Sequence, residues 1–448
     1  HNQSNMALVS FQLMLTQGIC PSSATFVCVL KACGDVGDED KGFEIHVEVV
    51  RKGLLKTNAL VGNALVDMYA KCGLLTRAHQ VLRELTLRDI VSWNALIAGY
   101  SDEGQGDEAL KCFERIQCES LSPDPVTFIC ILKACGIVRS IEKGKQIHEQ
   151  IVGGGFLEKE SVLGTSLVDM YAKCGVLSEA QQVLENLTSR NVVCWNALVT
   201  GYAQEGHDYE ALNCLERMQS EGVSPDSVTF ICILRSCGSI GAIDKGKQIH
   251  DKIVSMGLLE KDIMLGNTLV DMYAKCGLLT KAHEVLLELP VRDIVSWNAL
   301  ISGYVQHRRD HEALESFEKM QSDGLSPDEV TFTCILKSCG STGAIDKGKQ
   351  IHEKIVGKGL LEKDTGLGNA LVDMYAKCGM LSKAHELLEE LPVRSVVSWC
   401  ALISGHVQQG HYNVALNCFE QMQREGFSLD PITCICILNA CANTGDID

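Results

Sequence analysis

The sequence lacks the features that mark membrane proteins and the common types of enzyme. No apolar run approaches the roughly 18 residues that a membrane-spanning helix needs. There is no C-x-x-C pair, the spacing that structural zinc sites usually contain. It also has no glycine-rich phosphate loop and no nucleophile with a placed base. We therefore expect no catalytic residue, no metal, no cofactor and no small-molecule substrate.

Basic residues are scarce relative to acidic ones. The chain has 40 Lys and Arg residues against 57 Asp and Glu residues, which gives a net charge of −17. Because contact with phosphates requires a basic surface, this charge argues against nonspecific binding to nucleic acid. A local basic stripe on an acidic body would still permit a specific nucleic-acid binder.

Cysteine, in contrast, is abundant, with 22 residues that recur inside apolar stretches of a long chain. Secreted disulfide frameworks use cysteine densely in short chains, so we expect free, buried thiols in a reducing compartment. Some cysteines form pairs five residues apart, which places the two about 140° apart around a helix and prevents one helix from offering both to one ion. We interpret these pairs as small buried apolar residues: Cys28/Cys33, Cys130/Cys135, Cys232/Cys237, Cys334/Cys339 and Cys436/Cys441.

The dominant feature is an internal repeat of 102 residues. The string LVDMYAKCG begins at Leu65, Leu167, Leu269 and Leu371. All four tryptophans keep the same interval, at Trp93, Trp195, Trp297 and Trp399. Such a period indicates either a duplicated domain or a repeat array.

Each 102-residue unit divides further into three helical hairpins. The segment 294–328 contains two apolar stripes at helical spacing with a polar break between them, and Gly324 and Pro327 end it. Residues 329–364 and 263–293 repeat this plan, so hairpins of 35, 36 and 31 residues fill the unit. A hairpin of this size cannot bury its own apolar face. The pattern therefore predicts an all-α fold, an α-solenoid superhelix of stacked helix-turn-helix repeats.

The strings IVSWNALISGY, LVDMYAKCG and VTFICILRSCG resemble those of pentatricopeptide-repeat proteins of the plant PLS subclass, the type that includes RNA-editing factors. Proteins of this subclass alternate ordinary, long and short repeats. The resemblance covers the whole chain and implies a single array over residues 1–448. Partial repeats would occupy 1–22 and 431–448, and triplets of long, short and ordinary repeats would occupy 23–124, 125–226, 227–328 and 329–430.

The resemblance implies binding of single-stranded RNA with one base per repeat. In the family the fifth residue of a repeat faces the base edge, where an amide offers both a donor and an acceptor, and the last residue assists it. The pairs implied for the short repeats are Asn63 with Asp89, Thr165 with Asn191, Asn267 with Asp293, and Asn369 with Ser395. Those implied for the ordinary repeats are Asn94 with Asp124, Asn196 with Asp226, and Asn298 with Asp328. The family's code then predicts U-U-n-A-U-n-U-U-n-C from repeat 59–89 to repeat 365–395, where n marks a long repeat.

In the family the second residue of a repeat is apolar and lies between successive bases. The resemblance thus implies the base-sandwiching residues Leu60, Val91, Val162, Val193, Met264 and Val295. Gly366 departs from this pattern, and Cys400 replaces the expected polar residue at position five. At the same position the long repeats carry Val27, Ile129 and Ile231, with only Thr333 polar, so we expect them to read nothing or to act as spacers. In related proteins the long repeats are implicated in binding small organellar RNA-editing cofactor proteins.

Several of these residues also have a purely structural interpretation. Asparagine at position five is favoured near a helix start, where it can act as a cap. The lysines at position thirteen of the short repeats either contact phosphates or interact with the dipole at the end of a first helix: Lys71, Lys173, Lys275 and Lys377. The four tryptophans and the histidines of the QIH strings are interpreted as packing residues, not as stacking platforms or metal ligands.

Three functions are compatible with such an array. The first is sequence-specific RNA binding, as the target-recognition part of a C-to-U RNA-editing factor in a plant mitochondrion or chloroplast. We expect any targeting peptide to lie upstream of this chain, and no P-C-x-x-C of a zinc deaminase follows any H-x-E. The second is a protein-binding scaffold like the tetratricopeptide solenoids, which the acidic charge favours and the uneven repeat length disfavours. The third, an enzyme in its own right, has no motif in its support.

Overall fold

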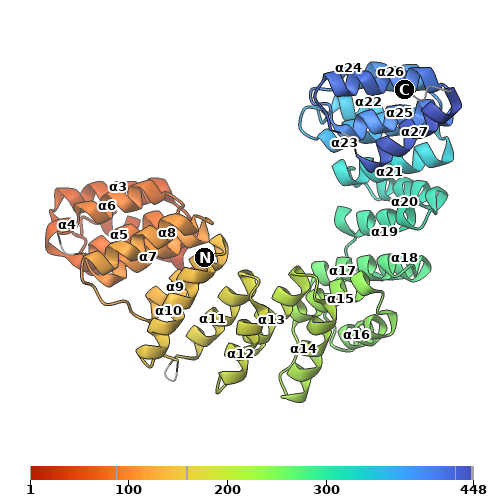
Figure 1. Ribbon diagram of the computed structural model, residues 1–448. Coiled ribbons are helices and arrows are strands. Elements are labelled where there is room, and N and C mark those ends of the chain that lie inside the picture. Colours follow the sequence, from red (N-terminus) through yellow and green to blue (C-terminus); the bar gives the residue numbers. More distant parts are fainter. Residues whose placement is uncertain (1, 87, 158–159, 429, 445–448) are drawn as a thin grey trace. The chain divides into compact units, whose positions relative to one another are not determined.

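A computed structural model describes residues 2–86, 88–157, 160–428 and 430–444, and the regular elements within these ranges are all helices (Figure 1). None of these helices is long and apolar enough to cross a membrane. The chain divides into two compact units, residues 1–232 and 233–448. The boundary between them falls inside α15 (Ser227–Ile240).

The first unit contains α1 (Asn2–Thr16), α2 (Ser23–Val36), α3 (Glu39–Arg51), α4 (Leu54–Thr57), α5 (Ala59–Lys71), α6 (Leu75–Glu84), α7 (Ile90–Asp102), α8 (Gly106–Cys118), α9 (Pro125–Val138), α10 (Ile141–Gly153), α11 (Ser161–Lys173), α12 (Leu177–Asn186), α13 (Val192–Gln204) and α14 (Asp208–Ser220). The second contains α16 (Ile243–Ser255), α17 (Ile263–Lys275), α18 (Leu279–Glu288), α19 (Ile294–Gln306), α20 (Asp310–Ser322), α21 (Glu329–Thr342), α22 (Ile345–Gly357), α23 (Thr365–Lys377), α24 (Leu381–Glu390), α25 (Val396–Gln408), α26 (Tyr412–Arg424) and α27 (Pro431–Thr444).

The helices pair as the repeat register predicts. Residues 294–328 form the hairpin α19–α20, 329–364 form α21–α22, and 263–293 form α17–α18. The second helix has 10 residues in a short repeat, as in α12, and 13 in long and ordinary repeats, as in α10 and α14. This difference contributes most of the alternation in repeat length.

Two details of the register were not predicted. The first long repeat contains an additional short helix, α4, for which the sequence pattern offers no account. Each partial repeat contributes a single helix, α1 at the N-terminal end and α27 at the C-terminal end. Residue 1 and residues 445–448 lie outside the described part of the chain.

Within each unit the first helices of successive repeats pack against one another. In the first unit these are α2, α5, α7, α9, α11 and α13, and in the second α17, α19, α21, α23, α25 and α27. The predicted packing role of the tryptophans is confirmed, since all four are at most 2% exposed in the core. A glycine in each ordinary repeat allows the close approach: a Cβ added to Gly201 would lie only 2.8 Å from the Cβ of Ala172 on α11.

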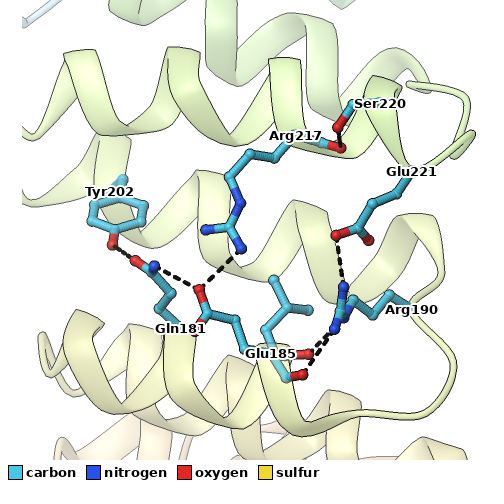
Figure 2. Close-up of polar contacts among 8 residues, drawn as sticks. Gln181, Glu185, Arg190, Tyr202, Arg217, Ser220 and Glu221 are labelled. Carbon is cyan, nitrogen blue, oxygen red and sulfur yellow. Dashed lines mark hydrogen bonds and ion pairs between the residues drawn. The ribbon is translucent and has the colours of Figure 1, made fainter.

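Polar contacts join the second helices of neighbouring repeats. Figure 2 shows Arg217 of α14 donating to the Glu185 carboxylate of α12 over 3.0 Å, next to a hydrogen bond from Tyr202 to Gln181. Arg190, in the loop after α12, forms an ion pair with Glu221. Equivalent ion pairs recur at intervals of 102 residues: Arg88–Glu119, Arg292–Asp323 and Arg394–Glu425. The same outer linkage is therefore built four times.

A histidine–tyrosine hydrogen bond also recurs, between each long repeat and the following short repeat. His250 Nδ1 and the Tyr273 hydroxyl lie 3.0 Å apart, and the other three pairs are His46–Tyr69, His148–Tyr171 and His352–Tyr375. This confirms the predicted packing role of the QIH histidines. Burial lowers the pKa of all four imidazoles.

The cysteines require a correction. No disulfide joins any of the 22 residues, and the second cysteine of each of the first four pairs is buried, namely Cys33, Cys135, Cys237 and Cys339. The prediction that both members of a pair are buried is wrong, because Cys28 is exposed and Cys130, Cys232 and Cys334 are partly exposed. Two residues about 140° apart on a helix cannot both face one core.

Candidate functional site

The last residue of a repeat is the N-cap of the next repeat's first helix. Asp89 accepts a hydrogen bond from the backbone N–H of Ser92 over 3.0 Å, and Asp124 accepts one from Thr127 over 2.8 Å. Asn191, Asp293, Asp328 and Ser395 are N-caps in the same way. An aspartate side chain is favoured here because it satisfies a backbone donor that the helix leaves unpaired.

The fifth residue of a repeat, in contrast, is not a cap. Asn63 and Asn196 lie inside α5 and α13, on the turn that approaches the cap of the next helix. The capping interpretation of these asparagines is therefore wrong, and it applies instead to the residue that ends the repeat.

The structure brings the predicted asparagine–aspartate pairs into direct contact. In all five, the amide Nδ2 donates to the carboxylate of the same repeat over 2.9–3.1 Å: Asn63–Asp89, Asn94–Asp124, Asn196–Asp226, Asn267–Asp293 and Asn298–Asp328. The two residues of a pair are 26 or 30 positions apart in the sequence, so only the folded hairpin joins them.

The carboxylates of Asp226 and Asp328 remain ionised in this environment. Burial raises the pKa of each, but backbone and side-chain hydrogen bonds from Thr229 or Thr331 and from the paired asparagine outweigh it, so each pKa is lowered overall. A charged acceptor makes a stronger hydrogen bond than a neutral one, which fixes the orientation of the amide beside it.

The other predicted pairs differ. Ser395 donates to Oδ1 of Asn369 over 2.8 Å, so that pair also meets. Thr165, however, lies 2.9 Å from the Sγ of Cys194, and Asn191 uses its side chain to cap α13. Cys400 occupies the place of the asparagine and donates to Asp430 over 3.3 Å.

The predicted base-sandwiching residues are exposed apolar side chains. Leu60, Val91, Val162, Val193, Met264 and Val295 expose between 54% and 69% of their surface, although most other apolar residues on these first helices are buried. Exposure of an apolar side chain at one fixed register position has no packing explanation and is typical of a binding surface.

These side chains line shared grooves along the first helices. One groove of about 610 Å³ in the first unit is bounded by Val162, Thr165, Lys173, Val193 and Asn196, together with Asp226. A second, of about 820 Å³ in the second unit, is bounded by Met264, Asn267, Val295 and Asn298, with Asp293 and Asp328. In each unit the residues at positions two and five and the terminal residue therefore face the same space.

The lysines at position thirteen end the first helices of the short repeats, and their charge is matched by a nearby aspartate. Lys173, Lys275 and Lys377 each form an ion pair over 2.7 Å with the aspartate four residues earlier, and Lys71 pairs with both Asp35 and Asp67. The D-x-x-x-K spacing in LVDMYAK was the available signal for these pairs. Lys173 and Lys377 nevertheless line grooves.

Sequence reasoning missed other residues in the grooves, among them several from long repeats. Val126, Val228 and Val330, at position two, are as exposed as their counterparts in the other repeats, and Val228 and Val330 line the two grooves above. Arg235 and Lys337, at position nine, also line grooves. Position within the repeat would have identified the valines.

Among the described residues, no group of three or more His, Cys, Asp or Glu side chains is placed to hold a metal ion. The site that recurs along the chain consists of an asparagine–aspartate hydrogen bond and an exposed apolar side chain, both facing a groove.

Comparison with known proteins identifies the origin of this repeat. The model of the PPR repeat family matches residues 88–136, 190–239, 292–341 and 394–443, and that of the PPR repeat matches 63–90, 165–192, 267–294, 330–360 and 369–396. The chain belongs to the pentatricopeptide-repeat family.

Curated relatives from Arabidopsis thaliana extend beyond this chain. Pentatricopeptide repeat-containing protein At5g27110 is 36% identical over 439 residues, covering 98% of this chain and 63% of the relative. Pentatricopeptide repeat-containing protein At4g18520, chloroplastic, is 35% identical over 423 residues, covering 94% and 67%. Pentatricopeptide repeat-containing protein At3g09040, mitochondrial, is 34% identical over 438 residues, covering 98% and 42%. The chain thus spans two thirds or less of the length of these relatives.

Among solved structures, the pentatricopeptide repeat protein PPR10 from maize matches 99% of this chain and 69% of its own, with a TM-score of 0.64 at 18% identity. PPR10 in complex with an 18-nt psaJ RNA element matches with a TM-score of 0.56 at 20% identity. These matches confirm the all-α solenoid fold.

Proposed function

We propose that this chain binds single-stranded RNA in a sequence-specific manner, with one base at each repeat of a single array over residues 1–448. The observation that carries the proposal is the recurring contact between the asparagine at position five and the terminal aspartate, beside an exposed apolar residue in a groove. A scaffold that binds only proteins has no need of this combination, which recurs in repeats 59–89, 90–124, 192–226, 263–293 and 294–328.

The chemistry of the pair suits a base edge. An amide nitrogen carries two N–H donors. In repeat 192–226 Nδ2 of Asn196 donates to the Asp226 carboxylate, and both residues line the groove. The second N–H is then available for an acceptor on a base, such as a uracil carbonyl.

The exposed valines supply the second component of binding. A base opposite Asn196 would lie between Val193 and Val228, which expose 56% and 50% of their surface to the groove. Covering this apolar surface with the faces of a base is favourable by about 25 cal/mol per Å² buried. The apolar contact with the valines is the same for every base, so the Asn196 amide selects which base binds.

The comparisons support RNA as the ligand, because one of the matching PPR10 structures is a complex with an 18-nt psaJ RNA element. Relatives named chloroplastic and mitochondrial support an organellar location. Within this proposal the chain is the target-recognition part of an organellar C-to-U RNA-editing factor of the PLS subclass, and small editing cofactor proteins bind at its long repeats.

The predicted RNA is U-U-n-A-U-n-U-U-n-C, read from repeat 59–89 to repeat 365–395. Lys71, Lys173, Lys275 and Lys377 are proposed to contact phosphates. Because an aspartate already matches each lysine, we expect a small loss of affinity from any one Lys→Gln change, with little effect on sequence preference.

The test is a change of preference at a single base. Replacing Asn196 with Thr should shift the preference of repeat 192–226 from U toward G, as the family's code implies, and weaken binding of the original RNA by about 1–3 kcal/mol. Asn94→Thr is the matched control, since it should cause the same shift from U toward G at the base of repeat 90–124 and leave the preference of repeat 192–226 unchanged. Competition binding at constant salt with RNAs that differ at one base measures both shifts.

An RNA of scrambled order at equal salt completes the test. If it binds as tightly as the predicted RNA, and neither threonine variant changes a base preference, the chain does not read RNA. A protein-binding scaffold is then the better interpretation.

A further inference from the structure

The asparagines at position five share one sequence role but occupy two different hydrogen-bonding environments. In the ordinary repeats, Oδ1 of Asn94, Asn196 and Asn298 accepts a hydrogen bond over 2.7, 2.5 and 2.6 Å. The donors are the hydroxyls of Thr127, Thr229 and Thr331, which occupy the third position of the next long repeat.

In the short repeats the same oxygen lacks that bond. Oδ1 of Asn63 and Oδ1 of Asn267 are buried without a hydrogen-bond partner, and the two side chains are only 6% and 7% exposed. The third residue of the next repeat is a serine, Ser92 or Ser296, and its hydroxyl donates instead to the backbone carbonyl of the cap residue over 2.8 Å.

Threonine and serine at this position share the capping function. The Thr229 hydroxyl accepts from the backbone N–H of Asp226, as the Ser92 hydroxyl accepts from that of Asp89. Both side chains are fully buried, so water does not replace their partners. They differ in the acceptors that the single hydroxyl proton can reach. The threonine hydroxyl lies within hydrogen-bond distance of Oδ1 of the position-five asparagine and of Oδ1 of the cap aspartate, with the asparagine oxygen the nearer of the two. The serine hydroxyl donates to the backbone carbonyl of the cap residue.

We infer that Thr127, Thr229 and Thr331 are positioning residues that set how strictly the preceding ordinary repeat reads its base. This inference rests on the proposed function. With Oδ1 held by threonine and Nδ2 held by aspartate, the amide can present only an N–H to the groove. Uracil offers a carbonyl acceptor where cytosine has an amino group, so the held amide accepts U and rejects C.

In a short repeat only the aspartate holds the amide. If the asparagine amide rotates by 180° to present Oδ1 to the amino group of cytosine, it loses the hydrogen bond to the aspartate but has no bond to a threonine to lose. Discrimination against C is therefore weaker in a short repeat than in an ordinary repeat. One hydrogen bond to a neutral group changes such an equilibrium roughly three- to tenfold. Ordinary repeats should therefore prefer U over C by about that factor more than short repeats with the same Asn–Asp pair.

Two reciprocal substitutions test this directly. Thr229→Ser keeps the capping hydroxyl and should lower the U/C affinity ratio at the base of repeat 192–226 roughly three- to tenfold. Ser92→Thr should raise the ratio at the base of repeat 59–89 by a similar factor. The ratio at the base of repeat 294–328, where Thr331 is unchanged, is the internal control.

A double-mutant cycle tests the contact without RNA. Asn196→Ala and Thr229→Ser should affect thermal unfolding non-additively, whereas Asn63→Ala and Ser92→Ala should be additive. Unchanged U/C ratios in both reciprocal variants would overturn the inference. The proposed function would still stand in that case if Asn196→Thr shifts the base preference of repeat 192–226. If no repeat shows a base preference and Asn196→Thr shifts none, both the inference and the proposed function are overturned.

The unfolding experiment is independent of RNA. Additive effects of Asn196→Ala and Thr229→Ser on thermal unfolding would overturn the inference whatever the RNA measurements show.

Discussion

At the scale of single residues, one carboxylate serves two groups at once. Asp226 caps the helix that follows it, through the backbone N–H of Thr229, and orients the amide of Asn196. Both tasks need an acceptor at the junction of two repeats, and the N-cap position places one there. The proposed base-reading position therefore uses a residue that the helix already favours for its own stability.

The two roles of Asp226 can be separated by substitution. Asp226→Asn keeps a good N-cap, so thermal stability should change by less than about 0.5 kcal/mol, but a neutral amide no longer fixes the orientation of Asn196. Asp226→Ala removes both functions and should cost about 1 kcal/mol of stability. Thermal unfolding and single-base competition binding measure the two effects. Equal U selectivity in wild type and Asp226→Asn would contradict the orienting role.

At the scale of the helices, the distance between repeats depends on small side chains at the contact of first helices. Gly201 on α13 faces Ala172 on α11, and a Cβ at Gly201 would also lie 3.0 Å from Cδ2 of Leu177. Gly99, Gly303 and Gly405 make the equivalent contacts in the other ordinary repeats. The grooves run along these same first helices, so the spacing of the helices sets the spacing of the asparagines at position five.

Enlarging this contact should destabilise the array. Gly201→Val would overpack the α11–α13 interface and lower the free energy of unfolding by about 1–3 kcal/mol, more than the gain from replacing a helical glycine. Gln204→Val, at an exposed position of the same helix, is the control and should change stability by less than about 0.5 kcal/mol. Urea unfolding followed by circular dichroism makes the comparison. A neutral Gly201→Val variant would show that the interface yields without cost.

At the scale of the whole molecule, repetition multiplies small effects. The histidine–tyrosine hydrogen bond, buried or partly buried, occurs once in each of the four 102-residue units. Because burial lowers the pKa of each histidine below the ordinary 6.5, the folded protein favours the neutral imidazoles. The stability they contribute is complete above pH 6.5 and is lost as the pH falls from 6.5 through the lowered values.

Thermal stability should accordingly decrease between pH 7 and pH 5. A variant with all four histidines replaced by glutamine (His46, His148, His250 and His352) should lose less of its Tm over this range than the wild type, because glutamine cannot be protonated. His311→Gln, at an exposed position, should retain the wild-type pH dependence. Aspartates such as Asp226, whose pKa lies below 3.8, titrate outside this window. Identical pH slopes for the wild type and the fourfold variant would contradict the assignment.

The period, the hairpins, the tryptophan core and the register of the asparagine–aspartate pairs could all be predicted from the amino-acid sequence. These features follow from apolar spacing, helix-ending residues and recurrence, which are properties of short segments. The family resemblance also placed Asn196 and Asp226 at matching positions, but it did not reveal that the aspartate is the cap of the next helix.

The partner that each polar group finds could be known only from the packed repeats. Thr127 and Asn94 are 33 residues apart, and nothing in the periodicity distinguishes the threonine hydroxyl that reaches the amide from the serine hydroxyl that turns to the backbone. Likewise, Cys28 is exposed while Cys33 is buried because of how α2 faces its neighbours. Hydrogen-bond partners are selected by the distances between side chains on packed hairpins, and those distances exist only after the repeats have stacked.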